Sequence, residues 1–348
     1  MSARPGVTVA ISSYNYARYL PATLHSALAQ EGVDLEVIVV DDASSDDSVR
    51  IAQDAARRDP RVRVIAHEAN RGHIATFNEA LGAATREYVV KLDSDDLLVE
   101  GALVRAARVL DAHPRVGMVY GRAIPFGDVP PAPARLAGAV RVWPGRRWLA
   151  VRARKATNVI FQPEVMVRRQ VLAQTDGHRA HIPAAHDLNL WLRLATLADV
   201  AYLHADQGYY REHGDSLLHS VYSGYLSDLR QRRLAFLDWL ATMSPADAER
   251  LGAPALERAV RRALARQALE WAARNATEAP ESAEEHAELA AFAAETSPGS
   301  TSWTARALAA VPRGASAGRG GRAAGALIER GLSARDALTW RRWRRFGI

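Results

Sequence analysis

The chain has 348 residues, of which 48% are hydrophobic and 24% are charged. This composition is typical of a globular protein with one large or two small domains, and it excludes a disordered chain, a collagen-like repeat and a disulfide-stapled miniprotein. Because the chain has no cysteine, it cannot form a disulfide, a zinc–thiolate site or a cysteine nucleophile. The formal net charge of +6 is compatible with anionic partners such as nucleotide diphosphates, lipid headgroups or nucleic acid, and by itself selects none of them.

The first third of the chain alternates strand and helix patterns. Apolar runs predict strands over 7–11, 35–40, 62–66 and 88–92, and apolar residues at helical spacing predict helices over 19–30, 46–58 and 75–84. Strands that alternate with helices form an α/β fold, with a mostly parallel sheet flanked by helices.

The rest of the chain changes character twice. Residues 121–154 are rich in Pro and Arg and are expected to be irregular, with a loop at 129–133, and a helix with an apolar face starts near Asp187. Strand patterns end after about residue 225, and helix-forming residues dominate from there on. We therefore expect a domain over 1–225, with halves 1–120 and 121–225, followed by an α-helical region over 226–348.

Neither a secretory leader nor an apolar stretch of membrane-spanning length is visible in the sequence. We therefore expect a cytoplasmic protein, either soluble or peripheral at the inner face of the membrane.

A polar cluster follows each predicted strand. The clusters are Ser12-Ser13-Tyr14-Asn15, Asp41-Asp42, Asn70-Arg71-Gly72 and Asp93-Ser94-Asp95-Asp96. Ligands of α/β sheets bind beyond the carboxyl ends of the strands, so we expect the four clusters to converge on one site.

The segment 93–96 places three carboxylates within four residues. Like charges this close repel each other, so the cluster costs stability unless a cation neutralises it. An oxygen-only ligand set suits Mg²⁺ or Mn²⁺, ions that also bridge to substrate phosphates. The plainer interpretation is a solvated turn with helix-capping Asp residues, and the position beside the other clusters favours the metal.

Asp41-Asp42 ends a strand, where a carboxylate can accept a hydrogen bond from a ring N–H of a nucleobase, and Tyr14 could stack on that base. The plainer interpretation is that Asp42, Ser44 and Ser45 cap the next helix. The two interpretations are compatible, because capping and ligand contact use different atoms.

Asn70-Arg71-Gly72 is typical of a turn that opens a helix. Gly72 would permit a positive φ there, and the amino end of the helix would favour an anion.

Two residues further along the chain are candidates for the reaction itself. Asp187 begins a helix, where a carboxylate either interacts with the helix dipole or acts as a general base toward an acceptor hydroxyl, and the sequence leaves both open. His213 lies in the polar loop 209–216, where it could ligate a metal or contact a diphosphate, although a lone loop histidine is more often only solvated.

Taken together, these motifs resemble those of family 2 glycosyltransferases with the GT-A fold. The matching stretches are 7–15 with Tyr19 and Leu20, 39–46, 70–72 with Asn78, 92–96, 186–193 and 210–213. They occur in family order and spacing, and they cover residues 5–220.

The resemblance implies a Rossmann-like GT-A domain whose half 1–120 binds the nucleotide and whose half 121–225 binds the acceptor. It also implies an inverting, hexosyltransferase-like enzyme that moves one sugar from a nucleotide-diphosphate sugar, by default a UDP-sugar, with Mn²⁺ or Mg²⁺. By that analogy Asp41 reads the base ring, Ser12 and Tyr14 flank it, and Asp187 is the general base. Asp95 carries the metal, with Asp93 and His213 as further ligands. The other donor contacts would be Asn70, Arg71, Gly72, Asp93 and Ser94.

Two departures from the family pattern matter. His186 stands where members often have Glu, which leaves the role of His186 open. The Gln-x-x-Arg-Trp motif and transmembrane helices are not found in the sequence, so we expect a single-sugar transferase rather than a processive polysaccharide synthase.

Two alternative functions stay open. One is a nucleotidyltransferase acting on a sugar phosphate, but such sites usually begin with a Gly-rich loop that segment 12–15 lacks. The other is a non-catalytic GT-A-like binding module, and the presence of Asp41, Asp93, Asp95 and Asp187 speaks against it.

No motif identifies the acceptor, so a surface glycan, a glycolipid, a natural product and a peptide all fit. The carboxy-terminal segment 338–348 interleaves Arg with Trp340, Trp343 and Phe346. This pattern suits either a peripheral membrane contact or a helix packed on its own domain. Nucleic acid is not expected as a main partner.

Overall fold

The computed structural model describes residues 4–214, 224–278 and 283–298, together with the single positions 341, 343, 345 and 347. The chain divides into two compact units, one formed by 1–149, 159–220 and 347 and the other by 150–158, 221–346 and 348. We expected a boundary after residue 225, with 150–158 in the first domain.

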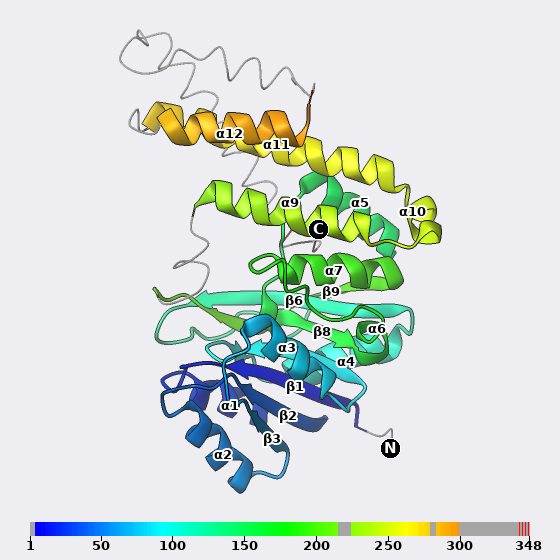
Figure 1. Ribbon diagram of the computed structural model, residues 1–348. Helices are drawn as coiled ribbons and strands as arrows, with labels where there is room; N and C mark the ends of the chain where they lie inside the picture. Colours follow the sequence, from blue (N-terminus) through cyan, green and yellow to red (C-terminus); the bar gives the residue numbers. More distant parts are fainter. Residues whose placement is uncertain are drawn as a thin grey trace. The chain divides into compact units, whose positions relative to one another are not determined.

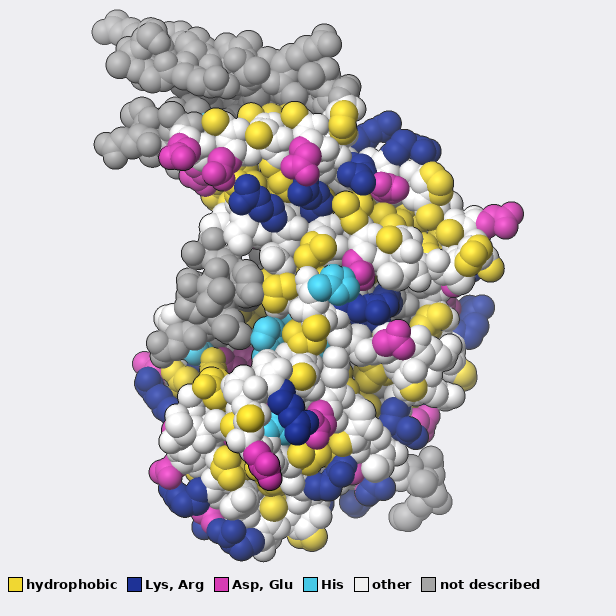
Figure 2. Space-filling model, viewed as in Figure 1, with side chains coloured by type: hydrophobic (Ala, Val, Ile, Leu, Met, Phe, Trp, Pro, Cys, Tyr) yellow, Lys and Arg dark blue, Asp and Glu magenta, His cyan; other side chains and the backbone are white. Residues whose placement is uncertain are grey.

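On the face shown in Figure 2, basic and acidic side chains are interspersed, so the positive net charge is not gathered there into one basic surface.

The first unit is built on one sheet (Figure 1). Its described strands follow the order β3-β2-β1-β4-β8-β6-β9-β5, with β7 paired to β9. The parallel part consists of β1 (Gly6–Ser13), β2 (Asp34–Asp41), β3 (Val62–Ala66) and β4 (Tyr88–Asp93). The helices between these strands are α1 (Leu20–Leu28), α2 (Ser48–Arg58) and α3 (His73–Gly82). These elements confirm the alternation expected for the first third of the chain, with ends that differ by a few residues.

Both faces of the parallel strands are covered, which explains their nearly continuous apolar sequence. Val7, Val9 and Ile11 of β1 pack in one core cluster with α1, α2 and α4 (Ala102–Ala112). The alternate side chains point to the opposite face, where α3 contacts β1 and β2. A slip by one residue would exchange the two faces, so this burial defines the register.

The register brings the strand ends together. Pairing of β1 with β2 places Ser13 opposite Asp41, and pairing of β1 with β4 places Ser12 opposite Asp93. The chain passes from β1 to β2 and β3 and then returns to the other side of β1 for β4. The ends of β1 and β4 therefore flank a topological switch point, where ligands bind in open α/β sheets.

The second half of the sheet is mixed, and the sequence analysis did not anticipate its strands. β8 (Val165–Arg168) is antiparallel to β4 and to β6 (Val116–Phe126), and β6 is parallel to β9 (Asp199–Arg211). β5 (Leu97–Leu98) and β7 (Val140–Trp143) pair antiparallel with β9. The remaining described elements of this half are α5 (Gly145–Lys155), the 3₁₀ helix η1 (Gln162–Glu164), α6 (Arg169–Leu172) and α7 (His186–Leu197).

The expectation that 121–154 is irregular is wrong, because β6, β7 and α5 occupy most of it. β7 has exposed side chains, so it lacks the apolar run that marks a buried strand. Residues 127–139 form the expected loop. The buried carboxylate of Asp206 accepts the N–H groups of Ala134 and Arg135 at 2.9 and 2.8 Å, and so fastens this loop to β9.

The second unit is helical, as expected. Its helices include α9 (Tyr225–Ala241), α10 (Pro245–Leu251), α11 (Ala253–Glu278) and α12 (Ala283–Thr296). Between α9 and α10, the Ser244 side chain caps α10 by accepting the Asp247 N–H at 3.1 Å. Gly252 ends this helix with a φ of +69°, which glycine adopts without a steric penalty.

None of the described helices is both long enough and apolar enough to cross a membrane. Of the three aromatic residues expected at a membrane, Trp340 and Phe346 lie outside the described residues. Trp343 is only 7% exposed, and this burial favours packing within the protein for that residue. Membrane contact of the tail stays a prediction.

We expect the hydrogen bonds of Arg232 to contribute strongly to the stability of the helical unit. Its buried guanidinium donates to the Ala156 carbonyl, to Gln267 Oε1 at 2.8 Å and to Asp228 Oδ2. Arg232→Leu leaves these acceptors unpaired and should lower the free energy of unfolding by about 2–3 kcal/mol. In denaturant titrations followed by circular dichroism, the exposed control Arg230→Leu should change it by less than about 0.5 kcal/mol. Similar losses in both variants would contradict this account.

Candidate active site

The loops that follow β1 and β2 are joined by hydrogen bonds. Asn15, with a φ of +56°, donates its N–H to Ser44 Oγ at 2.8 Å and accepts the Ser45 N–H at 2.8 Å. Next to this contact, Ser12 is partly buried and Tyr14 is 48% exposed. The Tyr14 ring is therefore accessible to a ligand at the carboxyl ends of β1 and β4.

Asp41 is fully buried, and both of its carboxylate oxygens are occupied. Oδ1 accepts the Ser44 N–H at 2.8 Å and Oδ2 accepts the Ser44 hydroxyl at 2.7 Å. Asp41 thus stabilises the loop below the expected position of the base, and its contact with the base ring stays a prediction.

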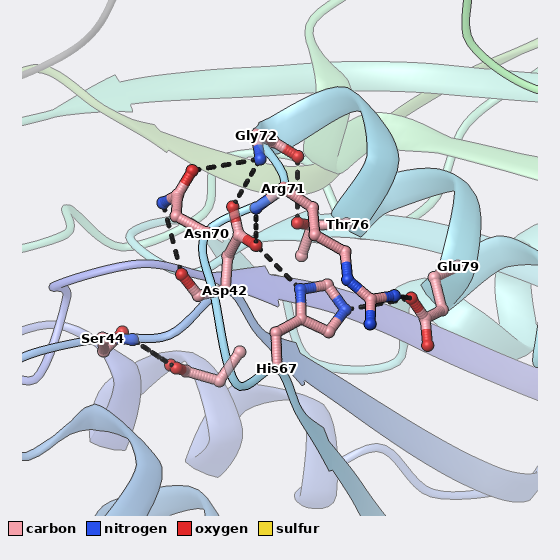
Figure 3. A network of polar contacts seen from close by, with 9 residues as sticks. Asp42, Ser44, His67, Asn70, Arg71, Gly72, Thr76 and Glu79 are labelled. Carbon is pink, nitrogen blue, oxygen red and sulfur yellow. Dashed lines mark hydrogen bonds and ion pairs between the residues drawn. The ribbon is translucent and has the colours of Figure 1, made fainter.

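Asp42 contacts the turn before α3 (Figure 3). Its carboxylate accepts the N–H groups of Arg71 and Gly72 at 2.7 and 2.8 Å, and His67 Nδ1 lies 2.7 Å from Oδ1. Burial raises the pKa of Asp42, but these N–H donors outweigh burial and lower the pKa below its ordinary value. Gly72 has a φ of +85°, which confirms the positive φ expected there.

This network uses part of the turn at which we expected an anion, and the anion site at the amino end of α3 stays a prediction. The backbone N–H groups of Arg71 and Gly72 already bind Asp42, and Asn70 Nδ2 donates to the Asp42 carbonyl at 3.2 Å (Figure 3). Asp42 therefore occupies the two backbone N–H groups just before the helix. Asn70 is exposed, and the Arg71 guanidinium, 3.3 Å from Glu79 Oε2 and 59% exposed, is accessible to a ligand.

The three carboxylates at the end of β4 have different surroundings. Asp93 accepts a hydrogen bond from Lys91 Nζ at 3.0 Å, and Asp95 Oδ2 lies 2.8 Å from His213 Nε2. Asp96 is 1% exposed; its Oδ1 accepts the Arg211 N–H at 2.8 Å, and its buried Oδ2 has no hydrogen-bond partner among the described residues. Burial, followed by the charges of the neighbouring carboxylates, raises the pKa of both Asp95 and Asp96.

The end of β9 lies against this cluster. Arg211 Nε donates to the Asp95 carbonyl at 2.8 Å, and the Arg211 guanidinium stacks 4.7 Å from the centre of the Tyr19 ring and 4.3 Å from that of Phe126. The His213 ring lies 5.1 Å from that of Tyr19. The structure thus brings His213 to Asp95, although the two residues are far apart in the sequence. Ser94, also expected at the site, is 5% exposed, and its carbonyl accepts the Thr23 hydroxyl at 2.9 Å.

The residues present fit a divalent cation. Asp95 Oδ2 and His213 Nε2, 2.8 Å apart in a hydrogen-bonding contact, are both atoms that can ligate a divalent cation. The Asp93 side chain, 31% exposed, can supply another oxygen. The unpartnered Asp96 oxygen adds negative charge that a cation would compensate.

Asp187 lies in the first turn of α7, and its side chain is 23% exposed. His186 Nδ1 lies 2.8 Å from Asp187 Oδ1, and the side-chain amide of Gln162, with its NH₂ group toward the carboxylate, donates to both oxygens at 3.1 and 3.2 Å. Burial raises the pKa of Asp187, but His186 and Lys91 outweigh burial and hold that pKa well below its ordinary value. Asp187 is therefore an ionised carboxylate that reaches the surface.

Lys91 interacts electrostatically with both Asp187 and Asp93, and we did not predict this residue from the sequence. Its ammonium contacts Asp93, lies 3.5 Å from the centre of the Phe77 ring and is 5% exposed. Two signals were available: Lys91 interrupts an apolar strand, and it is one of two lysines among 45 Lys and Arg residues. Gln162, Arg211 and His178 were also missed, and the sequence around them carries no comparable signal.

Comparison with known proteins identifies the family. Residues 8–173 match the family model described as glycosyl transferase family 2. The "Succinoglycan biosynthesis protein ExoO" of Rhizobium meliloti is 44% identical over 108 residues, which cover 31% of this chain and only 30% of ExoO. The "Putative glycosyltransferase EpsE" of Bacillus subtilis is 30% identical over 196 residues, which cover 56% of this chain and 68% of EpsE.

Solved structures agree with the fold. Staphylococcus aureus TarS 1-349 in complex with UDP aligns with a TM-score of 0.54 and 19% identity over 75% of this chain and 71% of that one. The mannosyltransferase PcManGT from Pyrobaculum calidifontis, in complex with GDP-Man and Mn²⁺, aligns with a TM-score of 0.52 and 22% identity over 97% and 88%. The chain belongs to glycosyl transferase family 2, and the expected α/β fold with a helical C-terminal region is confirmed.

Asp42→Ala is expected to lower the free energy of unfolding by about 3 kcal/mol, because three N–H donors lose a buried anionic acceptor. The pKa of Asp42 is depressed in the folded protein, so its stabilisation is complete above its ordinary pKa of about 4 and is lost as the pH falls through the folded value. The difference in melting temperature between wild type and variant should therefore shrink in acid. The exposed control Asp47→Ala should change stability by less than about 0.5 kcal/mol, and an equal loss there would refute the role of Asp42.

Proposed function

We propose that this family 2 protein is an inverting glycosyltransferase that moves one sugar from a nucleotide-diphosphate sugar to an acceptor hydroxyl. One observation carries the proposal: the first unit holds both an ionised carboxylate suited to a general base and a separate group of carboxylates suited to bind a cation. Asp187 is ionised and partly exposed, and Lys91 connects it with Asp93, which stands beside the candidate cation ligands Asp95 and His213.

On the donor side, Asp93, Asp95 and His213 would hold Mn²⁺ or Mg²⁺. When bound, the ion would neutralise the negative charge of the leaving diphosphate. The exposed Tyr14 ring would stack on the base, with Ser12 beside it, and the Arg71 guanidinium would meet the donor's negative charge. The TarS complex with UDP and the PcManGT complex with GDP-Man and Mn²⁺ support a nucleotide-sugar donor and a divalent metal, with a UDP-sugar as our leading choice.

On the acceptor side, Asp187 would take the proton of the attacking hydroxyl. The acceptor oxygen then forms its bond to the anomeric carbon while the bond from that carbon to the diphosphate oxygen breaks on the opposite face, which inverts the configuration. A general base of this kind contributes about 10²–10⁴-fold to the rate. Lys91 helps the reaction indirectly, because its charge favours the ionised form of the base.

For the acceptor we propose a glycan. ExoO is named for succinoglycan biosynthesis, and this name favours a surface glycan over a lipid, a natural product or a peptide.

Asp187→Asn should lower turnover of the donor by about 10²–10⁴-fold, because the amide cannot accept the proton, and should leave binding of UDP with Mn²⁺ unchanged. Release of UDP from UDP-sugars measures the first quantity, and thermal shift measures the second. Asp176→Asn, at a side chain that is 81% exposed, is the matched control. Turnover of Asp187→Asn at the wild-type rate would remove Asp187 from the mechanism.

Asp95→Asn should abolish the joint effect of metal and nucleotide. We expect the wild type to be stabilised by one nucleotide of a panel of UDP, GDP, TDP and CDP, and only with Mn²⁺ present. A ligand at about 100 times its Kd adds about 2.7 kcal/mol of stability. Asp128→Asn, at a side chain that is 90% exposed, should keep the full shift. A full metal-dependent shift in Asp95→Asn would place the ion elsewhere.

A further inference from the structure

Two buried histidine rings, those of His186 and His178, lie next to the carboxylate of Asp187. His186 Nδ1 lies 2.8 Å from Asp187 Oδ1 and 2.9 Å from His178 Nδ1. The two rings are perpendicular, with centres 4.5 Å apart, and His178 and His186 are 3% and 8% exposed. The geometry thus joins three polar side chains through a single ring nitrogen.

The chemistry of the three groups defines where the protons lie. The ionised Asp187 carboxylate can only accept, so His186 Nδ1 must carry a hydrogen. His178 Nδ1 faces that N–H and must present its lone pair, which places the His178 proton on Nε2, a buried nitrogen with no hydrogen-bond partner among the described residues. Burial, followed by the nearby His186 and Lys91, lowers the pKa of His178 well below its ordinary value, and this keeps its ring neutral as the arrangement requires.

The surrounding residues hold the pair in this orientation. Asn78 of α3 binds the backbone of His178 twice, accepting its N–H at 2.7 Å and donating to its carbonyl at 2.9 Å. His73 Nε2 donates to the Pro183 carbonyl at 3.1 Å, and its ring lies 5.6 Å from that of His186. Hydrogen bonds therefore hold the loop before α7 against α3 at two positions, His178 and Pro183.

We propose that His186 and His178 are positioning residues for the base Asp187. The His186 Nδ1–H binds Oδ1 of the carboxylate, and His178 orients the His186 ring by accepting the same N–H. Asp187 Oδ2, which in the part of the chain that the structure describes accepts only from the Gln162 amide, keeps a lone pair to take the proton of the acceptor. This inference rests on the proposed function of Asp187. It also gives a role to His186 and to Asn78, which the sequence had left without one.

The distances favour hydrogen bonds over a metal held by His178, His186 and Asp187. Tetrahedral zinc with bonds of about 2.0–2.1 Å separates its ligand atoms by about 3.3 Å. The observed 2.8 and 2.9 Å are shorter and fit a three-centre hydrogen bond in which the one His186 Nδ1–H is shared between an oxygen and a nitrogen acceptor. The three groups do offer ligand atoms within 4.8 Å of one another, so the test below includes zinc.

Nitrogen-15 NMR of protein labelled at histidine tests the pair without any substrate. We expect His186 to carry its proton on Nδ1 and His178 on Nε2, with signals assigned from the His186→Asn and His178→Asn variants. A spectrum in which His186 carries its proton on Nε2 alone would overturn the proposal. Retention of one equivalent of zinc by the purified wild type, lost in His178→Asn, would also overturn it.

Kinetics provide the second test. His186→Leu should lower kcat about 10- to 100-fold with the donor KM unchanged, since the lost contact acts on the base and not on donor binding. His186→Asn restores an N–H near the Nδ1 position and should recover most of the rate, and the exposed control His181→Leu should retain it. If Asp187→Asn is impaired but His186→Leu is not, only this inference fails. If Asp187→Asn is unimpaired, the proposed function fails.

Discussion

The repulsion among Asp93, Asp95 and Asp96 at the end of β4 is the constraint on which the rest of the site depends. Three carboxylates so close together are unstable in a partly buried position without positive charge around them. Lys91 contacts Asp93, the Arg211 N–H contacts Asp96, and His213 contacts Asp95, yet one buried oxygen of Asp96 still lacks a partner among the described residues. A site with this excess of negative charge is suited to bind a cation, and the bound cation can in turn bind an anionic group of a ligand.

The same residues explain why two distant parts of the first unit form one site. β9 pairs with β5, which follows the carboxylate cluster directly, so the last residue of β9, Arg211, contacts Asp96, and His213, two residues beyond the strand, contacts Asp95. Lys91, on the strand that leads into the cluster, acts on Asp93 and on Asp187 together. The charge of this one ammonium group therefore acts both on the donor side of the proposed reaction and on its general base.

Sequence patterns predicted what depends on local order and failed for what depends on contacts across the chain. Parallel strands with both faces buried have apolar runs that a sequence reveals, and their ends converge by topology, so the convergence of Ser12, Asp41 and Asp93 could be predicted. The edge strand β7 has exposed side chains and gives no such run. Which of two adjacent carboxylates contacts the turn before α3 depends on the register of β2, so the sequence could not assign that contact to Asp42. The contact between His178 and His186 depends in turn on how the loop before α7 folds back on α3.

The anomeric configuration of the first product tests the central claim most directly. Purified protein, a divalent metal and an α-linked UDP-sugar would be followed by proton NMR from the first minutes, with water as the acceptor where no better one is known. If Asp187 directs attack from the face opposite the diphosphate, the β-anomer should appear first and only later equilibrate with the α-anomer. Initial accumulation of the α-anomer would contradict a single displacement and with it the role proposed for Asp187.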